Sequence, residues 1–123
     1  MNRLIKISFG TLFLLSSSIA FACDYPERPA IPDGSIASKD ELIAAKNSVQ
    51  DFMANVDEYL NCIEGAEKAA VEEMDSPSEE VLQRRDEMLN KKFDAANEEK
   101  ALLGEQFNQE IRAYNTKLQE SKE

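Results

Sequence analysis

The sequence contains no histidine, and this absence removes several classes of function at the outset. Histidine is the commonest general base, the usual zinc ligand and the usual sensor of pH near neutrality. Serine–histidine and cysteine–histidine catalysis are therefore excluded. The two cysteines do not form a C-x-x-C motif, and the D-x-D-x-D-G spacing of a calcium loop is missing. We accordingly predict a protein that is not an enzyme, with no catalytic residues, no metal site and no cofactor.

Basic residues are also few. The 123 residues carry 24 acids against 14 bases, a net charge of −10. Two of the bases, Arg3 and Lys6, lie within residues 1–22, which contain no acid, so residues 23–123 hold 24 acids and 12 bases. Nucleic acids and anionic lipid headgroups are polyanions, and such a surface repels both. We therefore predict no nucleic-acid partner.

Residues 1–22 have the pattern of a signal peptide. Arg3 and Lys6 form a basic start, residues 7–21 are largely apolar, and Ala20-Phe21-Ala22 is the small-x-small pattern that precedes cleavage. We predict cleavage after Ala22 and a periplasmic or secreted protein with no stable membrane insertion afterwards. An uncleaved anchor is an alternative, although the span is short for a crossing of about 20 residues. Lipidation of Cys23 is another, although the bulky Phe21 disfavours it.

Residues 23–37 form a predicted extended arm. Pro26, Pro29 and Pro32 recur every third residue, which excludes a helix and suits polyproline II. The arm is long enough to turn at Asp33-Gly34 and run back along the following helix to Cys62. Two cysteines in a small exported chain favour one disulfide, and we predict a Cys23–Cys62 bond. Two free thiols, or Cys23 bonded to another chain, remain alternatives.

The rest of the chain predicts two helices. Ser38 and Glu41 form a capping box that begins a helix over about 38–74. A second capping box, with Ser76 as the N-cap and Glu79 at its end, begins a helix over about 77–119, and residues 120–123 are a frayed tail. The apolar residues of the first helix keep a heptad spacing, at Leu42, Ala45, Val49, Phe52, Val56, Tyr59, Ile63, Ala66 and Ala70. The second repeats it at Leu82, Leu89, Phe93, Ala96, Leu103 and Phe107.

A predicted turn of two to three residues makes the helices antiparallel, so the fold class is an all-α, coiled-coil-like two-helix hairpin with a stapled arm. Met53 and Leu60 lie beside the seam, on the flank away from Cys62, and should face Asn97 and Asn90. These four residues are our candidate partner-binding site. The alternative is that Met53 and Leu60 only widen the seam of the hairpin itself.

The pattern C-x-x-P-x-x-P-x-x-P-D-G, from Cys23 to Gly34, followed by Y-L-x-C at residues 59–62, resembles a group of small exported proteobacterial proteins. The resemblance covers residues 23–62 and implies an architecture without an activity. Our expectation for function is a non-enzymatic periplasmic interaction or structural module, whose partner is another protein or a second copy. The alternatives are a self-associating helical scaffold and, less favoured, a small ligand carrier or hydrolase.

Overall fold

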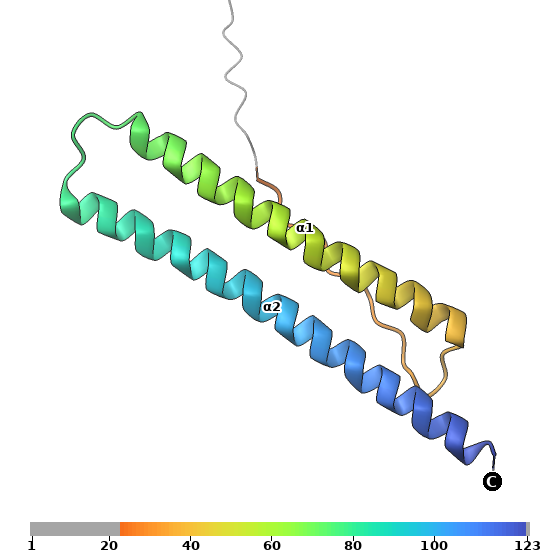
Figure 1. Cartoon of the computed structure of the whole chain (residues 1–123). Coiled ribbons are helices and arrows are strands. Elements are labelled where there is room, and N and C mark those ends of the chain that lie inside the picture. The colour runs from red at the N-terminus through yellow and green to blue at the C-terminus, as the bar shows by residue number, and fades with distance from the viewer. Residues whose placement is uncertain (1–22, 123) are drawn as a thin grey trace, which may run out of the picture.

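The computed structural model describes residues 23–122 as two long helices and an extended arm. Helix α1 is Lys39–Glu72, helix α2 is Glu79–Glu120, and these described residues contain no strand. The helices run antiparallel, side by side, and the arm passes across them from the middle of α1 to the end where α1 begins and α2 ends (Figure 1). The predicted all-α hairpin is confirmed. The predicted signal peptide, residues 1–22, lies outside the described part of the chain.

The start of α1 follows the sequence prediction. The Ser38 hydroxyl accepts a hydrogen bond from the Glu41 backbone N–H at 3.2 Å, and the Glu41 carboxylate accepts one from the Ser38 N–H at 2.7 Å. This reciprocal capping box satisfies two backbone donors that a helix leaves without partners. The Ser38 hydroxyl also donates to the Glu41 carboxylate, at 2.8 Å. The hydrogen bonds from the Ser38 N–H and from this hydroxyl hold the pKa of Glu41 below its ordinary value.

The start of α2 corrects the prediction that Ser76 is the N-cap. The cap is Ser78, whose hydroxyl accepts from the Val81 N–H at 3.3 Å, while Ser76 has a positive φ of 49° in the linker. Capping by Ser78 places two acids, Glu79 and Glu80, in the first turn, where the helix dipole favours negative charge. The linker between the helices therefore spans six residues, 73–78, instead of the two to three that we expected.

The core is a single seam between the helices. Its buried members are Val49, Phe52, Val56, Leu60, Ile63, Ala96 and Leu103. Leu103 and Val56 are fully buried, whereas the ring of Tyr59 packs only partly against the seam. The buried position that we assigned to Tyr59 thus belongs to its neighbour Leu60. The reason is the arm, which lies against Tyr59 and covers that side of α1.

The arm is fixed at both of its ends. The predicted disulfide is confirmed: Cys23 and Cys62 are bonded, with a Cα–Cα distance of 5.7 Å, and such bonds are typical of oxidising compartments. At the other end, the Gly34 N–H donates to the Glu110 carboxylate of α2 at 2.7 Å, and Lys117 donates to the carbonyl oxygen of Ala37 at 2.5 Å. Ala37 is buried in this contact. None of the described helices is long and apolar enough to cross a membrane.

Candidate functional site

The predicted partner-binding stripe is not an exposed surface. Leu60 is only 7% exposed and belongs to the core, and Met53 is half-buried and packs against it. Met53 lies beside Gly104 of α2, because its terminal methyl is 3.4 Å from the place where a Cβ of residue 104 would be. The expectation that Met53 and Leu60 remain uncovered was therefore wrong. Both residues widen the seam between the two helices, which is the alternative that we kept open.

The register across the hairpin also differs from the prediction. Asn97 and Asn90 are both exposed, and the Asn90 amide donates to Asp86 on its own helix at 3.1 Å. The place opposite Met53, where we expected Asn97, is taken by Gly104, two helical turns further along α2. The prediction assumed a tight turn that keeps the helix ends level. The six-residue linker does not impose this, and in the observed register Lys100 donates to Asp57 at 2.5 Å.

A different feature emerges on the side of the hairpin that the arm covers. The arm begins at Cys23 and runs toward the end where α1 begins, so it covers only part of the groove between the helices (Figure 1). Between Cys23 and the linker the groove stays open, with a volume of about 480 Å³. We call this part the tip groove. Its apolar lining comes from both helices: Ile63, Ala66, Ala70, Met88 and Leu89.

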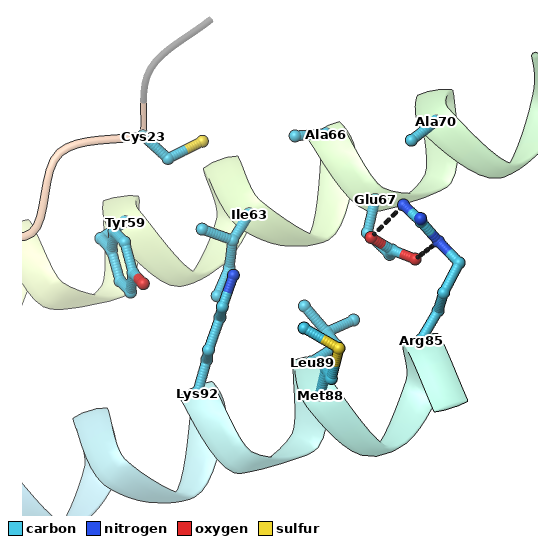
Figure 2. Close-up of a pocket in the computed structure, with 10 residues that line it drawn as sticks. All are labelled: Cys23, Tyr59, Ile63, Ala66, Glu67, Ala70, Arg85, Met88, Leu89 and Lys92. Atoms are coloured by element: carbon cyan, nitrogen blue, oxygen red, sulfur yellow. Dashed lines mark hydrogen bonds and ion pairs between the residues drawn. The ribbon is translucent and has the colours of Figure 1, made fainter. Parts of the chain in front are cut away.

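Polar side chains bound the tip groove at its two ends. Toward the linker, Arg85 makes a two-pronged ion pair with Glu67, at 2.6 and 2.9 Å, that bridges the helices (Figure 2). Toward the arm, Lys92 extends from α2 in the direction of Ile63, close to Tyr59 (Figure 2). The Glu67 and Arg85 side chains are only 25% and 31% exposed, so their geometry is better fixed than that of an ordinary surface pair.

The arm shows what kind of chain this groove accepts. The ring of Tyr25 packs edge-on against Tyr59 and Phe52, with centroid distances of 5.0 and 6.2 Å. Burial and the nearby Glu99 carboxylate raise the pKa of Tyr25. The Arg28 guanidinium pairs with Glu99 and donates to Gln106 at 2.7 Å. Ile31 packs against the core. An extended chain is thus held by apolar side chains in the groove and by polar bonds to α2.

The cysteines and the carboxylate beside the tip groove are all engaged with other groups. Both cysteines are consumed by the disulfide, and the one carboxylate in the lining, Glu67, is engaged by Arg85. The groove is an open trough, so water reaches its lining. Within residues 23–122, no group of acids and cysteines is placed to hold a metal ion.

Sequence reasoning missed the tip groove, although a signal for it is present. Ala66 and Ala70 are two small residues in succession at the end of the heptad seam of α1, and they follow large ones at Phe52, Val56 and Ile63. Small side chains in a seam leave space when no third element fills it. Ala66 is exposed here, which is unusual for a seam position. Comparison of the chain with protein-family models, with curated proteins and with solved structures gave no match.

Proposed function

We propose that this chain is an exported, non-enzymatic binding protein whose tip groove takes an extended segment of a partner protein. The observation that carries the proposal is the half-filled groove. One part is occupied by an extended segment of the chain itself, and the adjoining part, with the same two helices as walls, is open and apolar. The volume of about 480 Å³ lies within the range of ordinary ligand sites.

The arm supports the kind of partner as well as the place. The arm lies on the hairpin as an extended segment and packs two of its apolar side chains, Tyr25 and Ile31, against it. A partner segment that enters beyond Cys23 meets Ile63 and Leu89 on the floor of the groove. We expect it to place an apolar side chain there. Met88, which is 56% exposed at the rim, is flexible enough to adapt to different side chains.

Export is part of the proposal. Its support is the leader pattern of residues 1–22 together with the Cys23–Cys62 bond, which would not persist in a reducing cytosol. The bond also leaves Cys23 without a free thiol, which argues against the alternative of lipidation at that sulfur.

A pair of variants tests the use of the tip groove. A photo-crosslinking residue at Ala66, exposed within the groove, should form adducts with a partner in the periplasm. Met88→Lys should weaken these adducts at least several-fold. Leu102→Lys is the matched control, because Leu102 is 54% exposed on the same helix and lies outside the groove. Adducts that form equally with a crosslinker at exposed Asn61, or that survive Met88→Lys, would show that the groove is not the binding site.

A further inference from the structure

A second cavity continues the tip groove along α2, past Lys92. It has a volume of about 320 Å³ and is lined by Tyr25 from the arm and by Ala95 and Ala96 from α2. Tyr59 and Lys92 line both this cavity and the tip groove, so the two adjoin. We call the second cavity the arm slot. A chain that lies in the tip groove can therefore reach the arm slot.

Charged residues of α2 mark the two ends and the middle of this combined site. Arg85, Lys92 and Glu99 follow one another at intervals of seven residues, so they lie along one side of the helix. Arg85 pairs with Glu67 of α1 at the linker end, and Glu99 pairs with Arg28 of the arm at the far end. Among the described residues, Lys92 makes no hydrogen bond or ion pair. It is the one charged side chain of the two linings without a partner on that part of the chain.

The acids near the start of the arm belong to a different cavity. Asp24 and Glu58 line that cavity together with Asn55 and Cys62, and neither acid lines the tip groove or the arm slot. The chain as a whole has a net charge of −10, so an unpaired lysine between two apolar surfaces departs from the general charge of the molecule. A carboxylate bound beside Lys92 would complete the row of ion pairs along this side of α2.

The arm shows how an extended chain engages these helices. Four of the arm residues that contact the helices recur at every third position: Tyr25, Arg28, Ile31 and Gly34. Three half-buried prolines keep the same interval: Pro26, Pro29 and Pro32. A repeat of three residues is that of polyproline II, which rises about 3.1 Å per residue. A partner segment in this conformation presents side chains on one side about every 9.3 Å.

The tip groove and the arm slot are spaced to match that repeat. On α2 the tip groove is lined by positions 85, 88, 89 and 92, and the arm slot is lined by the same pattern seven residues further on, at 92, 95, 96 and 99. Seven residues of helix span about 10.5 Å. Two side chains three positions apart on one segment can thus enter the groove and the slot together, and the residues between them pass Lys92.

We propose that the partner segment is acidic and carries two large apolar side chains three positions apart, one for the tip groove and one for the arm slot, with a carboxylate between them that pairs with Lys92. This inference rests on the proposed function and names the chemistry of its partner. The apolar side chains set the position of the segment, and the carboxylate discriminates against segments with a basic residue at that place.

Synthetic peptides provide the probe. The first is acetyl-Gly-Pro-Phe-Glu-Glu-Phe-Pro-Gly-amide, in which both positions between the two aromatic residues are acidic. The second has Gln-Gln in place of Glu-Glu. The third, acetyl-Gly-Pro-Phe-Glu-Phe-Glu-Pro-Gly-amide, has the composition of the first with the aromatic residues only two positions apart. Amide chemical shifts of the exported, oxidised protein are followed with up to about 1 mM peptide. We expect the first peptide to shift Ala66 in the groove and Ala95 in the slot, and to bind at least about threefold more tightly than the other two.

Two variants with matched controls locate the contacts. Lys92→Gln should weaken binding of the Glu-Glu peptide at least about threefold and leave the Gln-Gln peptide unchanged. Lys91→Gln, at an exposed lysine outside both cavities, should change neither. Ala95→Leu fills the slot and should weaken the Glu-Glu peptide at least about fivefold, whereas Ala101→Leu, the same change at an exposed alanine outside the slot, should not. All four positions are exposed, so the variants should remain folded, as circular dichroism can check.

The outcomes separate this inference from the proposed function. Equal affinity for the Glu-Glu and Gln-Gln peptides, or no loss of affinity with Ala95→Leu, would overturn the inference, while shifts at Ala66 would still support binding in the tip groove. Crosslinked adducts at Ala66 in the periplasm, without binding of any peptide at about 1 mM, would also overturn the stated chemistry and leave the proposed function standing. Absence of both adducts and peptide binding would contradict both proposals.

Discussion

Replacing Gly34 by alanine tests whether the arm is seated on α2 as closely as the structure requires. A Cβ on residue 34 would lie 1.8 Å from the carbonyl oxygen of Glu110, and 2.7 Å from its carbonyl carbon. Real Cβ atoms stay beyond 3.0 Å of such atoms, so the arm must retreat from α2 by about 1.2 Å or more. The glycine is needed for space and not for its backbone angles, since the described glycines have no positive φ.

The stability that Gly34→Ala should lose follows from the hydrogen bonds that hold the arm at this point. A retreat of this size breaks the 2.7 Å bond from the Gly34 N–H to the Glu110 carboxylate and strains the 2.5 Å bond from Lys117 to Ala37. A hydrogen bond to a charged group contributes roughly 1.5–3 kcal/mol. We expect Gly34→Ala to lower the free energy of unfolding by about 2–3 kcal/mol, since the sites are partly exposed and the disulfide still holds the other end of the arm.

Urea unfolding of the oxidised protein, followed by circular dichroism, measures this loss. Amide hydrogen exchange should show that protection is lost at residues 34–37 and kept in the middle of α1. Gly65→Ala is the matched control, because nothing lies within 4 Å of a Cβ there and Gly65 is inside α1. It should raise stability by about 0.5–1 kcal/mol, the usual gain for alanine over glycine in a helix. If Gly34→Ala is as stable as the wild type, the arm does not pack on the α2 backbone as described.

Further predictions concern the staple, the core, the caps and the leader. Reduction of Cys23–Cys62, which closes a separation of 39 residues, should lower the free energy of unfolding by about 4 kcal/mol while helicity persists; unchanged urea midpoints would refute a stabilising staple. Leu103→Ala, at a fully buried site, should cost about 2–5 kcal/mol in the same assay, and a loss below 1 kcal/mol would contradict its place in the core. Acidification should destabilise the fold: the pKa of Glu41 and of Asp33 is lowered by hydrogen bonds from Ser38 and Ser35, so the stabilisation they give at neutral pH is lost as the pH falls through and below about 4. Glu41→Gln should make the free energy of unfolding less dependent on pH. A pH dependence as steep as that of the wild type would contradict the role given to the Glu41 carboxylate. Intact mass spectrometry of the exported protein should give a chain that begins at Cys23, and a retained Met1 would refute cleavage after Ala22.

Local patterns were enough to predict the features that depend on few residues. The capping box at Ser38 and Glu41 needs only its own four residues, and the Cys23–Cys62 bond follows from the number of cysteines and the length of the arm. The heptad spacing determines that two helices pair. These interactions are either short in range or have few competitors, and that is why the sequence specifies them.

The errors concern choices between close alternatives. Tyr59 and Leu60 are adjacent, and either can face the seam until the arm is placed over Tyr59. Ser76 and Ser78 are both good caps, and only the structure distinguishes them. The register depends on the conformation of a six-residue linker, which the sequence does not determine. The tip groove depends on where the arm stops, so it could not be found from either helix alone.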